Sequence, residues 1–206
     1  MKPATCNARR GFAMVLSLCL MAVVTGPSTA ASQQKLEIKN VAEKKLKQLP
    51  AGPLYWRIEN FPTLSQAQAV AGETALAAEI SGKVWLFTLA AKDGATPGAT
   101  KVVEVGPVPP IAAPEYLLRI NHASGEPGAK TPVHTHPGSE AFFVLSGRLG
   151  QRTAHGVSYA DPGQAMNGHG ADMPMEVFSA GTVDLDQLVM FVVDASRPFS
   201  SPAKFE

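Results

Sequence analysis

The chain has 206 residues, which is enough for one domain and a leader segment. Its 18 basic residues nearly balance its 17 acidic ones, so the composition gives no basic surface of the kind that nucleic acid or an anionic membrane would bind. Both cysteines, Cys6 and Cys19, fall within the first thirty residues. The remaining sequence therefore offers no disulfide, no thiolate metal ligand and no cysteine nucleophile.

Residues 1–30 have the order of a secretory signal peptide. Lys2, Arg9 and Arg10 form a basic start, an apolar run covers residues 12–24, and small residues follow up to Ala30. The apolar run is shorter than the roughly 20 residues of a membrane span, so no span is expected after cleavage. We expect cleavage after Ala30 and export to the periplasm or out of the cell. The mature chain would then carry 15 basic and 17 acidic residues, a net charge of −2.

The leader leaves two export routes open. The order Arg9-Arg10-Gly11-Phe12 resembles the core of a twin-arginine signal, but Ala8 stands where that pattern prefers Ser or Thr. Two arginines in the basic start of an ordinary Sec signal explain the same residues equally well. Lipidation at Cys19 is not expected, because the preceding Leu18 is larger than a lipoprotein signal allows in that place.

Residues 31–53 are predicted to form a helical arm or linker. Apolar residues recur on one side of a helix over residues 33–49, and lysines cover the other side. These apolar residues are Leu36, Val41, Leu46 and Leu49. Two prolines and a glycine in residues 50–53 would end the helix.

Residues 54–206 have the pattern of an antiparallel β domain. Thr63 and Gln66 resemble a capping box, which predicts one short helix ending near Ala71. The apolar run 188–193 predicts a strand that is buried on both faces. Short strands separated by Gly and Pro turns are typical of a sandwich or barrel. The other predicted strands cover residues 54–59, 75–80, 84–89, 102–105, 116–121, 140–145, 149–153, 157–160 and 175–179.

His134, His136 and Glu140 are predicted to share one divalent metal ion. Residues i and i+2 of a strand point to the same face, so both imidazoles can face one ion. Residues 137–139 can reverse the chain, and Glu140 then brings a carboxylate to that face at the start of the apolar stretch 141–145. Two neutral imidazoles and one carboxylate, with open positions opposite, form a facial triad that suits Fe, Mn, Ni, Cu or Zn.

The stretch 128–147 resembles the first sequence motif of the cupin superfamily. Its five fixed positions are met by Gly128, His134, His136, Glu140 and Gly147. The resemblance implies an all-β, jelly-roll-like antiparallel barrel in which the two histidines and the glutamate hold a metal. It also implies a further metal-binding histidine from a second motif, and a homodimer, because cupins often pair through sheet edges.

The second motif of the family is only partly present. Gly156 and Pro162 have its spacing, but Gly163 follows Pro162 directly and Asn167 occupies the expected histidine position. His169 lies two residues further on in a glycine-rich loop, and we predict it as the fourth metal ligand. The alternative is that water or Asn167 takes the fourth position.

The other candidate residues carry weaker signals. His155 is expected at the surface, in a turn between strands. His122 is either a hydrogen-bonded loop residue or an acid/base group at the mouth of the barrel. Four further residues could border the pocket or be ordinary strand positions: Tyr116, Arg119, Tyr159 and Met166.

Three functions are compatible with this site. The first is an oxidoreductase that resembles cupin dioxygenases acting on flavonols or thiol compounds, in which the metal binds a small organic substrate and O₂ and Glu140 could act as base. The second is a non-catalytic protein that binds a metal or a small ligand, and the third is an isomerase or hydrolase with the ion as Lewis acid. Export in the folded state would allow Mn or Fe to be loaded first, whereas export in the unfolded state favours Zn or Cu.

Overall fold

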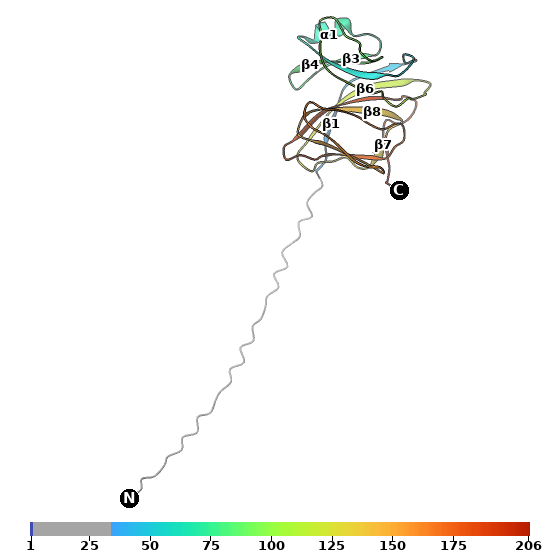
Figure 1. The fold of residues 1–206 in the computed structure, drawn as a ribbon. Coiled ribbons are helices and arrows are strands. Elements are labelled where there is room, and N and C mark those ends of the chain that lie inside the picture. Colours follow the sequence, from blue (N-terminus) through green and yellow to red (C-terminus); the bar gives the residue numbers. More distant parts are fainter. Residues whose placement is uncertain (2–33) are drawn as a thin grey trace. The chain divides into compact units, whose positions relative to one another are not determined.

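The computed structural model describes Met1 and residues 34–206. The predicted signal peptide, with its arginine pair and both cysteines, therefore lies outside the described residues. The regular secondary structure of residues 34–206 is almost entirely antiparallel strand, with one short helix (Figure 1), which confirms the all-β prediction. No helix in this part of the chain is long and apolar enough to cross a membrane.

Two five-stranded sheets form the barrel. The first has the order β1 (Glu37–Leu46), β6 (Tyr116–Gly125), β13 (Leu185–Asp194), β8 (Gly138–Ser146) and β11 (Ala165–Asn167). The second has the order β10 (Gly156–Ala160), β9 (Leu149–Thr153), β12 (Met175–Ser179), β7 (His134–Thr135) and β14 (Ser201–Pro202). Neighbours such as β6 and β13 are far apart in sequence, as in a jelly roll, so the predicted cupin-type fold is confirmed.

The barrel core lies between these two sheets. Phe142 and Val189 of the first sheet pack with Leu149 and Val177 of the second in one buried cluster. Alternate residues of β13 point the other way and belong to a second cluster on the outer face of the first sheet. The predicted strand 188–193 is therefore buried on both faces, as its continuous apolar sequence indicates.

A smaller sheet covers that outer face. Its order is β3 (Ala75–Ile80), β4 (Lys83–Ala90), β2 (Tyr55–Phe61) and β5 (Thr100–Val105), and Trp56 and Phe87 from it pack with Ile120 and Met190 of the barrel. The short helix α1 (Leu64–Val70) connects β2 to β3. The side chain of Thr63 accepts the backbone N–H of Gln66 at 3.3 Å, which confirms the predicted cap.

The predicted helical arm is wrong. Residues Glu37–Leu46 form strand β1, which pairs antiparallel with β6 at the edge of the first barrel sheet. A helix would satisfy its backbone groups internally, but it would leave the edge of β6 unpaired. Pairing across this edge also brings Glu43 within 2.6 Å of Arg119. Tertiary pairing thus overrides the weak helical preference of the sequence.

Candidate functional site

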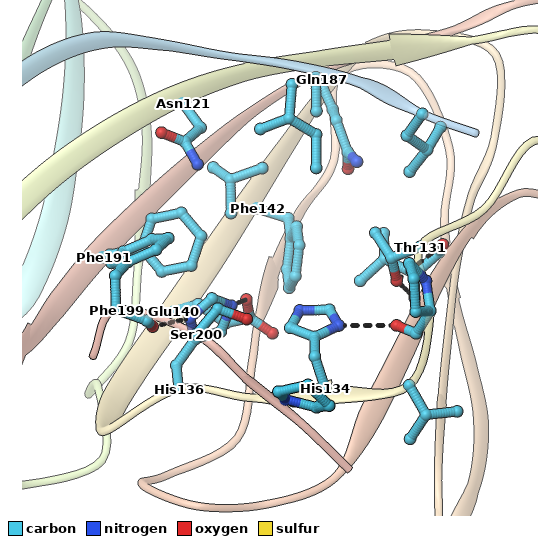
Figure 2. A pocket seen from close by; sticks show the side chains of 18 residues that line it. Asn121, Thr131, His134, His136, Glu140, Phe142, Gln187, Phe191, Phe199 and Ser200 are labelled. Carbon is cyan, nitrogen blue, oxygen red and sulfur yellow. Dashed lines mark hydrogen bonds and ion pairs between the residues drawn. The ribbon is translucent and has the colours of Figure 1, made fainter. Parts of the chain in front are cut away.

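A cavity of about 320 Å³ lies between the two barrel sheets. Its walls are mainly apolar, with Phe142, Val177, Val189, Phe191 and Phe199 among them. The side chains of His134, His136 and Glu140 gather at one end of this cavity (Figure 2). The three residues singled out by the motif therefore border a single, mostly apolar space.

Between β7 and β8 the chain passes from the second barrel sheet to the first, and this crossing places the three side chains. His134 lies on β7 opposite Met175, whereas Glu140 lies on β8 opposite Phe191. The crossing brings Gly138 against the backbone of β13, where a Cβ atom would lie 2.2 Å from the carbonyl oxygen of Val192. A glycine is therefore required at this point, and the crossing lets two sheets contribute to one site.

The distances between the donor atoms bear on whether they can share an ion. The rings of His134 and His136 are 4.9 Å apart and nearly perpendicular, and Nε2 of His136 lies 3.9 Å from Oε2 of Glu140. Two donors bound to one ion at about 2.1 Å lie at most about 4.2 Å apart, so these two atoms can reach a common ion. Residues 34–206 contain no group of three His, Cys, Asp or Glu side chains already placed to hold a metal, so the three-ligand site stays a prediction.

Backbone carbonyls orient both imidazoles. Nδ1 of His134 bonds to the carbonyl oxygen of Pro132 at 2.9 Å, and Nδ1 of His136 to that of Phe199 at 2.6 Å. A carbonyl oxygen only accepts, so Nδ1 carries the proton and Nε2 of each neutral ring keeps its lone pair. Metal-binding histidines are held in the same way by their second nitrogen. The chemistry of the donor set thus fits a divalent metal.

Burial sets the protonation of the site. It lowers the pKa of His136 to about 4, against the opposing hydrogen bond to Phe199. It raises the pKa of Glu140 to about 8, against the opposing hydrogen bond from Gln151. At pH 7 His136 is therefore neutral and Glu140 holds a proton that a metal would have to displace. Such perturbed groups inside a cavity are typical of functional sites.

Gln151 is a site residue that the cupin motif does not identify. It lies on β9, and its Nε2 donates to Oε1 of Glu140 at 2.8 Å. Strand alternation carries the signal that could have found it, because Leu149, Gln151 and Thr153 share one face and all three are buried. A glutamine between two inward-facing residues needs a polar partner inside the barrel.

The predicted fourth ligand does not border the cavity. His169 is half-buried in the loop after β11, where burial and the charge of His155 lower its pKa. Asn167, the alternative, is exposed and donates its amide to the carbonyl oxygen of Pro107 at 2.8 Å. Neither residue is among the described residues that line the cavity. A fourth ligand from His169 therefore stays a prediction.

The remaining histidines are not part of the cavity lining either. His122 lies on β6 rather than in a loop, and its Nε2 bonds to Oδ1 of Asp186 at 2.6 Å. This contact supports the hydrogen-bonded alternative for His122. His155 is exposed in the turn between β9 and β10, as predicted.

Arg119 acts on the site through its neighbours. Its guanidinium lies 4.1 Å from the ring centre of Phe199, whose carbonyl oxygen holds His136. Like Arg119 itself, the other three candidates lie outside the cavity lining. They are Tyr116, which accepts a backbone N–H, Tyr159, which is exposed, and Met166, which packs at the edge of the barrel core.

Comparisons with known proteins give partial likenesses. No protein-family profile matches the chain, and no curated protein matches it. Among solved structures, one of DMSP lyases is 24% identical and covers 42% of this chain and 44% of that chain, with a TM-score of 0.36. A cupin-like protein from Thermotoga maritima is 16% identical and covers 43% of this chain and 65% of that chain, with a TM-score of 0.38.

A third match is the polyketide cyclase RemF from Streptomyces resistomycificus, 19% identical over 43% of this chain and 62% of that chain, with a TM-score of 0.36. The chain thus spans less than two thirds of the length of each of these three proteins. The chain's own two antiparallel sheets, with neighbouring strands far apart in sequence, give it a cupin-type, jelly-roll-like fold.

Proposed function

We propose that the chain is an exported cupin-type protein that binds one divalent metal through His134, His136 and Glu140. We further propose that it uses the metal as a dioxygenase-like oxidoreductase on a small organic substrate. The observation that carries this proposal is a pair of imidazoles with free Nε2 lone pairs beside a buried carboxyl group in an apolar cavity. Burying such groups without a ligand costs folding free energy, which a bound metal would offset.

The protein would orient the metal ligands and keep water away from them. Pro132 and Phe199 fix the two imidazoles through their carbonyl oxygens, and Gln151 fixes one carboxylate oxygen of Glu140. The ring of Phe199 packs 4.8 Å from that of His136 and shields it from water. A bound ion would supply positive charge and open positions at which a substrate and O₂ can meet.

Glu140 is also suited to proton transfer. Gln151 occupies Oε1, so Oε2 is the oxygen that would bind the ion or, after leaving the ion, take a proton from a bound substrate. In the metal-free protein burial raises the pKa of Glu140 to about 8, so a carboxylate released from the ion in this cavity would be a stronger base than one in water. Oε1 would thus anchor the side chain while Oε2 exchanges between the ion and a proton.

Redox chemistry can be separated from the alternatives by metal substitution. We expect the Fe, Mn, Ni or Cu form to consume O₂ with quercetin or cysteine as probe, and the Zn form to be inactive. Turnover by the Zn form without O₂ would favour an isomerase or hydrolase instead. Full metal binding with no turnover of any probe would favour a binding protein. Glu140→Gln is expected to abolish O₂ consumption, and His155→Ala, outside the cavity, to leave it unchanged.

Export is proposed from the leader and has its own test. The protein recovered from the periplasm or medium of its host should begin at Ala31. Lysine replacement of Arg9 and Arg10 should block export if the signal is of twin-arginine type, and should leave it intact if the signal is of Sec type. If the unmodified protein stayed in the cytoplasm with its leader uncleaved, export would be contradicted.

A further inference from the structure

Two buried amide side chains face the same cavity away from the proposed metal ligands. Asn121 on β6 is 6% exposed and Gln187 on β13 is 1% exposed, and both line the cavity. Oδ1 of Asn121 and Oε1 of Gln187 have no hydrogen-bond partner. Figure 2 shows both amides on the opposite side of the space from His134 and His136. The motif gives no role to either residue.

The strand register explains why both amides point inward. Asn121 lies opposite Val189, and Glu140 lies opposite Phe191. Gln187, Val189 and Phe191 are alternate residues of β13, so all of these side chains share the inner face of the sheet. Asn121 lies one inward row from Glu140 and Gln187 two rows, which is about 7 and 14 Å along the strands. One small molecule could therefore contact both the amides and the predicted metal ligands.

An unpaired amide in an apolar wall requires an explanation. Both oxygens are shielded from bulk water, and no described protein group bonds to them. Leucine and methionine have nearly the shape of asparagine and glutamine and would fill the same volumes without this cost. Two polar residues at diagonal positions of neighbouring strands on this wall therefore indicate a ligand that pairs with them.

The polar and apolar groups of this wall indicate what kind of ligand would bind. An amide both donates through its NH₂ and accepts through its oxygen, so its complement is a group that also does both. No Lys or Arg is among the described residues of the lining, so an anionic group would lack a counter-charge there. The apolar walls favour an apolar body for the rest of the ligand.

We propose that Asn121 and Gln187 form a subsite for a neutral hydroxyl or amide group at one end of an otherwise apolar molecule. The other end of this molecule would extend toward His134, His136 and Glu140. The inference rests on the proposed function and names the class of substrate that the metal site would act on.

A matched pair of probes tests the subsite. p-Cresol and p-xylene share a shape and differ by a hydroxyl in place of a methyl group. In calorimetric titrations of the metal-free protein, we expect p-cresol to bind about tenfold more tightly than p-xylene. Asn121→Leu and Gln187→Met should each reduce this preference severalfold and leave p-xylene binding unchanged or tighter. His155→Ala should keep the wild-type preference. Equal binding of the two probes by the wild type, or an unchanged preference in both variants, would overturn the proposal.

Thermal unfolding shows whether the amides serve the ligand or the fold. Because they lack partners in the free protein, both variants should melt at or above the wild-type temperature. Lower melting temperatures in both would mean that the amides stabilise the empty protein, and this would overturn the argument for a ligand. Metal content is measured separately, so a failure of the subsite can be told from a failure of the proposed function. A protein without a metal site can still prefer p-cresol, and a protein that binds metal normally can lack that preference.

Discussion

Metal binding is predicted to release a proton from Glu140 at neutral pH. Burial raises the pKa of this carboxyl group to about 8 in the metal-free protein. About nine in ten molecules then carry the proton at pH 7, and about one in ten at pH 9. The pKa of His136 is lowered to about 4, so this residue is already neutral at both pH values and releases no proton.

The magnitude follows from this difference in protonation. Binding of a divalent ion should release about 0.9 proton at pH 7 and about 0.1 at pH 9, and the apparent affinity should rise about tenfold between them. Calorimetric titration with Ni(II) in two buffers of different ionisation enthalpy gives the proton count. The matched variant Glu140→Gln has no carboxyl proton and should lose the pH dependence together with most of the affinity.

The result at pH 7 decides whether the reasoning holds. Tight binding of one ion without proton release would mean that Glu140 is already ionised or does not bind the metal. Either outcome would contradict the burial argument, because an ion that displaces no proton cannot be held by a protonated carboxyl group.

Three further predictions follow from the same contacts. In the metal-free protein the folded state keeps the Glu140 proton up to about pH 8 while the unfolded state loses it near 4.5, so the free energy of unfolding should fall by about 2 kcal/mol between pH 6.5 and 8. Below pH 6.5 the unfolded state also takes up a proton on His136, which cancels the change of unfolding free energy with pH. Urea denaturation of Glu140→Gln should therefore show no fall in the free energy of unfolding above pH 6.5. Gln151→Leu should weaken metal binding at pH 7 by about 10- to 100-fold in competition with a chelator, because the hydrogen bond that lowers the pKa of Glu140 is lost; an unchanged affinity would contradict the role of Gln151. Gly138→Ala should lower the free energy of unfolding by more than about 2 kcal/mol, because its Cβ would lie 2.2 Å from the carbonyl oxygen of Val192, and a wild-type denaturation midpoint would refute this crossing.

The three residues at the end of the cavity could be identified from the sequence because they lie within one short stretch. His134, His136 and Glu140 have a spacing that a strand and a reversal bring to one place, and the structure gathers them at one end of the cavity. The strands Ala75–Ile80, Leu149–Thr153 and Met175–Ser179 also have the predicted bounds, because glycine, proline and alternating residues mark them.

The errors arise where distant parts of the chain decide the outcome. The helical pattern of residues 33–49 is weak, and only the open edge of β6 makes β1 a strand. Strands β7, β11 and β14 have two or three residues each, too few for any alternation to be recognised.

The polar residues of the cavity illustrate the same limit. Gln187 lies just before the predicted strand 188–193, and the structure extends this strand back to Leu185. Only the register between β6 and β13 places Gln187 diagonally across from Asn121 on one wall of the cavity. Only the packing of one barrel sheet against the other brings Gln151 to Glu140. The loop that holds His169 depends on packing around Gly168, whose N–H donates to the carbonyl oxygen of Glu140. Local patterns could not predict these contacts.

Elemental analysis of the purified protein tests the metal site most directly. The account predicts about one divalent ion per chain in the unmodified protein loaded to saturation. It predicts less than about a tenth of this in His134→Ala, His136→Ala or Glu140→Ala, because each substitution removes one of three ligands. His155→Ala should retain the full content, and far-ultraviolet circular dichroism should show that all variants keep the fold. Unchanged metal content in His134→Ala would contradict the central claim.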